Sequence, residues 1–195
     1  IIGTRPDCAG SEVMDYLERL NRQTFMIVEY GIESVSDQTL LRVNRGHDFE
    51  CSRRAIEETH NRGIMTCGHI ILGLPGESAE ENIRQSEVVS NLKLDILKLH
   101  QLQIIKGTQL AEEYCREPFK LYSADEYIDL CIRYLERLRN DIIVERFVSQ
   151  SPADMLIAPK WGLKNYEFTN RLVNEMKRRG TWQGRLISSS ASSTY

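Results

Sequence analysis

The feature that most constrains this chain is a unit that occurs three times along it. An apolar, β-branched stretch ends in a polar or glycine-rich turn and then leads into an amphipathic segment. The three turns contain T-R-P-D-C at residues 4–8, G-I-E-S at residues 31–34 and G-L-P-G-E at residues 73–77. Alternation of strands and helices at this period predicts right-handed βαβ units and a parallel sheet. This is the layout of a (β/α) barrel, in which the chemistry lies at the carboxyl ends of the strands.

The hydrophobic pattern predicts too few strands to close such a barrel. We expect strands at residues 1–4, 25–30, 64–72, 95–105 and 142–148, and helices starting near Ser11, Ser36, Phe49, Ser78, Ser123 and Tyr166. A closed barrel has about eight strands. We therefore predict an α/β fold that is an incomplete TIM-type (β/α) barrel, an arc of parallel sheet with helices on its outer face.

Composition narrows the class of protein. The chain has 195 residues, 41% hydrophobic and 27% charged, with a net charge of −3, which argues against a general nucleic-acid electrostatic footprint. The apolar stretches are too short to span a bilayer. The five cysteines are widely scattered and form no C-x-x-C pair, which argues against a disulfide framework or a structural zinc site. A reducing cytoplasm is the simplest interpretation, with Cys67 and Cys131 as small core residues.

Each turn motif has two interpretations when it is taken alone. The glycines of residues 73–77 would let the backbone approach a flat ligand, or they simply form a strand-to-helix turn. Glu33 would point into the barrel mouth and accept hydrogen bonds from sugar hydroxyls, or it favours a helix dipole. Arg45 would hold a carboxylate through two hydrogen bonds, or it is a solvated turn residue. For His100 in the fourth strand, a satisfied core histidine is favoured over a substrate contact. Arg5 and Asp7 are expected to pair with each other or with a neighbouring loop, and a substrate contact is the minority alternative.

The joined pattern is more specific than its parts. The motifs G-I-E-S, L-x-R-V-N-R-G-H and H-I-I-L-G-L-P-G-E resemble those of the radical S-adenosylmethionine (SAM) superfamily. With T-R-P-D-C before them and A-P-K-W and R-R-G-T-W-Q-G after them, the chain is similar to a widespread bacterial family of radical-SAM or Fe–S oxidoreductases of unassigned reaction. The resemblance extends to about Gly184.

The resemblance implies a set of cofactor-binding residues. Glu33 matches the polar residue that contacts the SAM end of the site, and Arg45 matches the arginine that binds the SAM carboxylate. His69 matches a position that approaches the ribose hydroxyls, although that position is usually acidic in relatives such as oxygen-independent coproporphyrinogen oxidase. A backbone contact to adenine falls near Ile71, and the end of the next strand faces the adenine near Gln101. Catalytic residues are not assigned.

The superfamily also binds a [4Fe–4S] cluster through C-x-x-x-C-x-x-C, and this motif is missing from the chain. The resemblance therefore implies that the chain is the C-terminal part of an enzyme that reductively cleaves SAM and abstracts hydrogen from an unknown substrate, with RNA as one candidate. We expect this part alone to bind no cluster and to be inactive. The alternative is a non-catalytic interaction module that has lost the cluster. A cysteine motif encoded upstream would favour the enzyme, and a start codon near Ile1 would favour the module.

Three expectations concern the edges and the end of the chain. Residues 1–150 are predicted to form the partial barrel, 151–185 a helical extension and 186–195 a disordered tail. The extension is rich in basic residues and contains four aromatic residues, Trp161, Tyr166, Phe168 and Trp182. These could stack on nucleic acid, but a solvated basic face is favoured. The open side of a half barrel predicts self-association through a surface that includes Ile1, Ile2, Ile27, Ile71 and Leu99.

Overall fold

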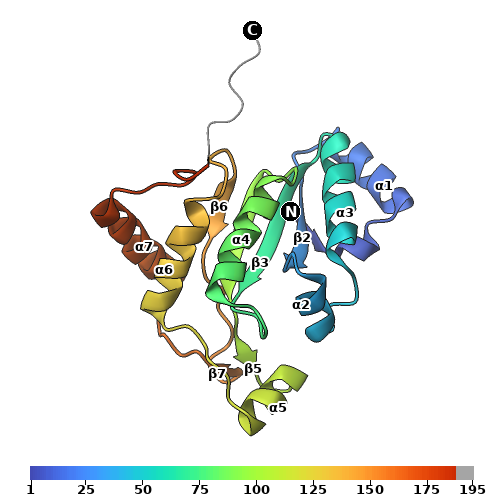
Figure 1. Cartoon of the computed structure of the whole chain (residues 1–195). Coiled ribbons are helices and arrows are strands. Elements are labelled where there is room, and N and C mark those ends of the chain that lie inside the picture. Colours follow the sequence, from blue (N-terminus) through green and yellow to red (C-terminus); the bar gives the residue numbers. More distant parts are fainter. Residues whose placement is uncertain (188–195) are drawn as a thin grey trace.

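Five parallel strands form the main sheet, in the order β1-β2-β3-β4-β6 (Figure 1). The computed structural model describes residues 1–187. The strands are β1 (Ile2–Thr4), β2 (Ile27–Glu33), β3 (Met65–Leu72), β4 (Ile96–Gln101) and β6 (Ile143–Arg146). All four pairings are parallel, so their carboxyl ends lie at one edge of the sheet. The predicted α/β fold with an open arc of parallel strands is confirmed.

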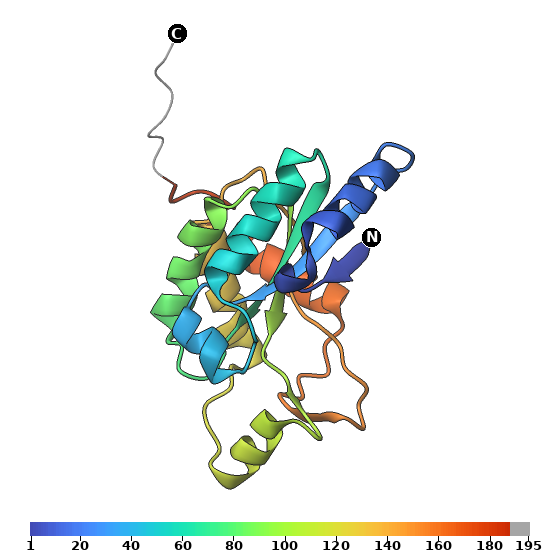
Figure 2. The ribbon, with the colours of Figure 1, turned by 90° about the vertical axis from the view of Figure 1, so that its right-hand side faces the viewer.

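Helices cover one face of this sheet, as Figures 1 and 2 show from two sides. They are α1 (Ser11–Asn21), α3 (Phe49–Asn61), α4 (Ala79–Ser90) and α6 (Ala124–Leu135), with α7 (Asn165–Arg179) packed against α6. Alternate strand residues such as Tyr30, Ile70 and Leu97 point into this helix layer and are fully buried. Because side chains alternate across a strand, the intervening residues lie on the opposite, inner face.

The inner face is more polar than the face under the helices. Its central positions include Glu29 on β2, His69 on β3 and Lys98 on β4. In β3, Cys67 and His69 lie on the inner face, whereas Ile70 points into the helix layer. This alternation gives the inner face its polar groups.

A small second unit lies at the carboxyl edge of the main sheet (Figure 1). The strands β5 (Ile104–Ile105) and β7 (Leu156–Ala158) pair antiparallel, and the helix α5 (Gln109–Arg116) packs against β5. A separate apolar cluster of Leu74, Leu102, Ile104 and Ala111 fills the space beneath α5. The sequence analysis did not predict α5 or β7, and it treated residues 95–105 as one strand. The chain leaves the sheet after Gln101, because β5 pairs with β7 instead.

Some predicted boundaries and contacts need correction. The N-cap of α1 is Gly10, which has no side chain to form a capping hydrogen bond. The helix α6 ends at Leu135. Leu99 was expected on an exposed surface, but it points into the helix layer and is fully buried. Ile1 is exposed, and β1 lies at one end of the strand order.

The short helix α2 (Asp37–Arg42) joins the turn after β2 to the following helix α3. The Ser36 hydroxyl caps it by accepting a hydrogen bond from the Thr39 amide. No helix among residues 1–187 is long and apolar enough to cross a lipid bilayer. The predicted disordered tail falls almost entirely outside these residues.

Candidate functional site

A hollow of about 460 Å³ opens where β2 and β3 end. Its wall combines the ends of these strands with residues of the turn after α2 and of α5. The lining residues include Glu33, Val43, Arg45, Ile71, Leu102 and Glu113. Glu33, Arg45 and Ile71, which the sequence analysis assigned to cofactor binding, thus line one hollow, and their role in binding stays a prediction.

Glu33 and Arg45 face each other inside this hollow. One Glu33 carboxylate oxygen lies 3.5 Å from Arg45 Nη2, and both side chains are about one-fifth exposed. Arg45 Nη2 also donates a hydrogen bond to the carbonyl oxygen of Gly31 at 2.5 Å. Arg45 Nε is buried and has no hydrogen-bond partner among residues 1–187. A buried guanidinium nitrogen without a partner is costly, so Arg45 lacks a hydrogen bond that burial normally requires.

The local backbone explains how these two side chains meet. Glu33 has φ of 68°, in the left-handed region, where the pairing of β2 with β3 shifts register. A side chain at this backbone conformation is strained, and such strain is common at binding sites. Gly31 makes room for the pair, because a methyl group there would overlap both the Glu33 carboxylate and the Arg45 guanidinium.

Burial also changes the proton affinity of Glu33. Burial raises the pKa of Glu33 above the ordinary value of a glutamate, and the nearby charge of Arg45 only partly offsets this. The carboxyl group therefore titrates closer to neutrality than an exposed glutamate does. A cationic or hydrogen-bond-donating ligand in the hollow would favour its charged form.

The glycine-rich turn after β3 is held by protein contacts. Gly73 has φ of 90°, and its amide donates to the Asn82 side chain at 2.9 Å. Glu77 accepts hydrogen bonds from the Ser34 hydroxyl at 2.5 Å and from the Gln85 amide at 2.9 Å. The turn after β3 is thus tied to the turn after β2, which fixes the rim of the hollow.

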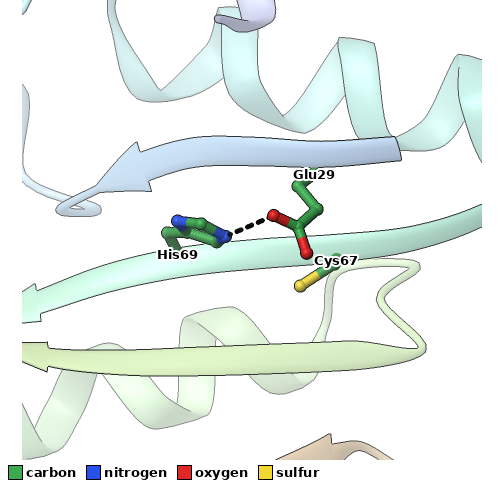
Figure 3. A group of neighbouring side chains, drawn as sticks. All are labelled: Glu29, Cys67 and His69. Carbon is green, nitrogen blue, oxygen red and sulfur yellow. Dashed lines mark ion pairs between the residues drawn. The ribbon is translucent and has the colours of Figure 1, made fainter. Parts of the chain in front are cut away.

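A second polar group lies deeper on the inner face. Lys98 on β4 pairs with Glu29 on β2, and its ammonium group lies 3.3 Å from a carboxylate oxygen of Glu145 on β6. The other Glu29 oxygen lies 3.3 Å from His69 Nε2 on β3 (Figure 3). The sequence analysis missed Glu29 and Lys98. The alternation of Glu29, Gly31 and Glu33 on one strand face was a signal that could have identified Glu29.

The side chains of His69 and Gln101, which the sequence analysis assigned to cofactor binding, lie near other protein groups. His69 turns toward Glu29 rather than into the hollow, which it does not line. The Gln101 amide is paired with the backbone of Ser149, accepting from its amide nitrogen at 2.9 Å and donating to its carbonyl oxygen at 3.1 Å. Any contact of Gln101 with a ligand would therefore involve its main chain. His100 was expected to be a satisfied core histidine, but its buried Nε2 has no partner within residues 1–187.

The basic and aromatic extension is partly a packing element. Phe168 is fully buried, and its ring stacks against that of Trp161, with centroids 6.0 Å apart. Tyr166 and Trp182 remain exposed. Arg179 is bound to Asp129 and Glu175, and Arg178 to Glu175. Two of the four aromatic residues are therefore committed to the core, which weakens the case for a stacking platform.

Near the start of the chain, the predicted pairing of Arg5 with Asp7 is present at 2.5 Å.

The cysteines occupy separate environments. Cys131 is buried in the helix layer, Cys67 is buried on the inner face, and Cys8 and Cys115 are exposed. Within residues 1–187, the three ligand-type side chains that gather closely enough for a metal are Glu29, Cys67 and His69. This donor set does not fit a [4Fe–4S] cluster, which needs several thiolates around one cluster.

The chain matches known protein families along most of its length. Residues 1–84 match the family described as the Radical SAM superfamily, and residues 94–178 match the Radical_SAM C-terminal domain. The chain belongs to the radical SAM superfamily. Within that superfamily, it is 34% identical to the uncharacterized protein YtqA of Bacillus subtilis over 95% of its own length. It spans 58% of YtqA, so it corresponds to about half of such a protein.

An archaeal sequence and an archaeal solved structure extend the comparison of this radical SAM chain. The tRNA uridine(34) acetyltransferase of Methanocaldococcus infernus is 25% identical over 92% of the chain, which covers 33% of that protein. The solved structure of Methanocaldococcus infernus Elp3 with an N-terminal deletion superposes with a TM-score of 0.82 at 24% identity. It covers 93% of this chain and 42% of the Elp3 chain. At this identity, the structural likeness supports the fold.

Proposed function

We propose that this chain forms part of the SAM-binding site of a radical SAM enzyme, with Arg45 as the residue that binds the SAM carboxylate. The observation that supports it most is the buried Arg45 Nε, which has no partner within residues 1–187 and belongs to a residue lining the hollow. A carboxylate is the anion that a guanidinium recognises best, because its two oxygens match the fork of N–H donors.

The other residues of the hollow have complementary parts in this proposal. The hydrogen bond from Arg45 Nη2 to Gly31 fixes the guanidinium, so little side-chain freedom is lost on binding. Glu33 offers an acceptor for the hydroxyl or ammonium groups of SAM. Ile71, Val43 and Leu102 add an apolar surface to the wall. His69 and the Gln101 side chain are engaged elsewhere and are left out of the proposed contacts.

SAM in this superfamily is reductively cleaved and supplies the radical that abstracts hydrogen from the substrate. The electron comes from the [4Fe–4S] cluster, which the donor set of residues 1–187 does not fit. We therefore assign this chain the binding and orientation of SAM and derive no electron-transfer step from it. A non-catalytic interaction module remains the alternative, and it would require no affinity for SAM.

Replacement of Arg45 tests the proposal. Charge-assisted hydrogen bonds contribute about 1.5–3 kcal/mol, so Arg45→Ala should weaken SAM binding roughly ten- to a hundredfold. Arg45→Lys should recover part of this loss, because lysine keeps the charge and lacks the planar fork. Calorimetric titration of SAM measures both. Arg53→Ala is the matched control, because Arg53 pairs with Glu50 and Glu57 on α3 and does not line the hollow. Equal affinity in Arg45→Ala and Arg53→Ala would refute the assignment.

We also propose RNA as a candidate substrate of the longer enzyme to which this chain would belong. Its support is the relative named as a tRNA uridine(34) acetyltransferase, together with the exposed rings of Tyr166 and Trp182. Stacking of one base on an aromatic ring contributes about 1–3 kcal/mol. If RNA binds there, Tyr166→Ala with Trp182→Ala should lower tRNA affinity in a filter-binding assay, whereas Tyr16→Ala, an exposed tyrosine on α1, should not. Equal effects would remove this surface from consideration.

A further inference from the structure

The inner face of the sheet holds a group of three metal-ligand side chains that the proposed SAM site does not use. They are Glu29 on β2 and Cys67 and His69 on β3 (Figure 3). One ligand atom from each residue lies within 4.8 Å of the others. Figure 3 shows the Glu29 carboxylate between the imidazole and the thiol.

The sheet register explains why these three side chains converge. Glu29 lies directly opposite Cys67 in the β2–β3 pairing, and His69 is two residues further along on the same face. The residue opposite His69 is Gly31, which has no side chain to separate the imidazole from Glu29. The arrangement is built on the central strands rather than on a loop, which favours a well-defined geometry.

The imidazole of His69 is left with an unused nitrogen. Its Nε2 is buried and makes no hydrogen bond of acceptable geometry with any described residue. The Glu29 oxygen at 3.3 Å is close to it but poorly aligned for such a bond. An imidazole nitrogen of this kind is a common ligand of transition-metal ions.

We propose that Glu29, Cys67 and His69 form a binding site for a divalent transition-metal ion, with Zn²⁺ as the best match. Sulfur, imidazole nitrogen and carboxylate oxygen are the three ligand types of zinc sites in proteins. Ligands at the usual zinc distances of about 2.0–2.3 Å lie about 3.5 Å apart in a tetrahedron. The Glu29 oxygen already lies 3.3 Å from His69 Nε2, and a separation at the 4.8 Å limit would need about 1.3 Å of contraction. Three protein ligands leave a fourth position open, as in catalytic zinc sites.

Lys98 holds the proposed metal ligand Glu29 in place. It binds one Glu29 oxygen, which leaves the other oxygen for the metal, and it keeps Glu145 as a second carboxylate partner. Hydrogen-bond donors that hold a ligating carboxylate in this way orient it and tune the metal. The charges also balance. A Zn²⁺ ion with a Cys67 thiolate and Glu29 is neutral, and so is Lys98 with Glu145.

Metal binding must displace the proton of Cys67. Zinc binds the thiolate form of a cysteine, and an ordinary thiol is protonated at neutral pH. Glu29 is paired with Lys98 as a carboxylate, so the thiol is the ligand that has a proton to lose. Zinc binding should therefore release about one proton for each ion bound. The thiolate should also give a cobalt–sulfur charge-transfer band when Co²⁺ replaces Zn²⁺.

Titration of the chain with Zn²⁺ and with Co²⁺, without iron or SAM, tests this site separately from the proposed function. We expect one ion per chain, release of about one proton in calorimetry across buffers of different ionisation enthalpy, and the cobalt–thiolate band. Cys67→Ser should remove both the band and the proton release. His69→Gln should keep the band and lower the affinity at least about tenfold.

Control variants exclude binding at other residues. Cys115→Ser removes an exposed thiol and should leave affinity, proton release and spectrum unchanged. If Cys67→Ser does not fold, His69→Gln and the proton count still decide the question. Zinc binding that is equal in Cys67→Ser, His69→Gln and the unmodified chain would overturn the proposal, as would cobalt binding without a thiolate band. Loss of SAM binding in Arg45→Ala with zinc affinity retained would show that the two sites are separate.

Discussion

Two glutamates on one strand show how the same side chain acquires two characters. Glu29 and Glu33 both lie on the inner face of β2, separated by Gly31 on that face. Glu29 is paired with Lys98, and the hydrogen bond and charge of that lysine lower its pKa even though burial alone would raise it. Burial raises the pKa of Glu33, and the charge of Arg45 offsets this only partly, since Arg45 lies 3.5 Å away and donates its hydrogen bond to Gly31 instead.

The difference indicates which part of the face is structural and which is prepared for a ligand. The Glu29–Lys98 pair joins β2 to β4 across β3, so it fixes the register of the inner face. Glu33 and Arg45 are incompletely paired, and Glu33 has a strained backbone. Proteins retain such strain where it serves binding. We call Glu29 and Lys98 the lower pair, and Glu33 and Arg45 the upper pair. We therefore expect substitutions in the lower pair to act mainly on stability and substitutions in the upper pair to act mainly on ligand affinity.

Removal of the lysine should have the largest effect. Lys98→Met would leave Glu29 largely buried without a cation, and breaking such a pair costs about 3–5 kcal/mol. We expect the urea midpoint to fall accordingly in chelator-treated protein. The double variant Glu29→Gln/Lys98→Met should recover much of the loss, because no unpaired charge is left.

Lys93→Met is the control for this change, because Lys93 is exposed and its loss should alter stability by no more than about 0.5 kcal/mol. If Lys98→Met lowered the urea midpoint no more than Lys93→Met does, the pairing of Glu29 with Lys98 would not contribute substantially to stability.

A smaller effect is expected from a methyl group placed between the two glutamates. Gly31→Ala would push against both Glu33 and Arg45, and overpacking of this kind typically costs about 1–3 kcal/mol. We expect lower stability together with weaker SAM binding. Gly3→Ala on β1 is the control, since nothing lies within 4 Å of the added methyl group there. A normal urea midpoint for Gly31→Ala would mean that the upper pair shifts freely and is not preorganised.

Glu33 and Arg45 of the upper pair could be singled out from the sequence, whereas Glu29 and Lys98 of the lower pair could not, for a physical reason. Glu33 ends β2 and Arg45 lies in the turn after α2. Turns and element ends carry local signals such as glycine, proline and capping residues. The order of strands and helices was also readable, because each of the main helices has a local cap or an amphipathic pattern. These signals depend on residues close together in the chain.

The lower site depends on residues far apart in sequence. Glu29, His69 and Lys98 meet only when β2, β3 and β4 are paired in the observed register. The small unit of α5, β5 and β7 was missed for a related reason. Its two short strands are separated by residues 106–155 and are stabilised by each other and by a small apolar cluster rather than by their own pattern. The burial of Leu99 likewise follows from which face of β4 the helices cover.

Neutralising each glutamate in turn should have opposite effects on stability, of smaller size. The pKa of Glu29 is lower in the folded protein than in the unfolded chain. Its charge therefore stabilises the fold above the unfolded pKa, and this stabilisation is lost as the pH falls through the folded pKa. The pKa of Glu33 is raised on folding, so its charge destabilises the fold at pH values above the folded pKa, and the penalty disappears below the unfolded pKa.

In chelator-treated protein at neutral pH, Glu29→Gln should lower the urea midpoint and Glu33→Gln should raise it. At pH values below the ordinary range of a glutamate, both variants should approach the unmodified chain. Urea titrations at several pH values measure the two curves, and curves of the same sign would show that the two carboxylates have equivalent surroundings.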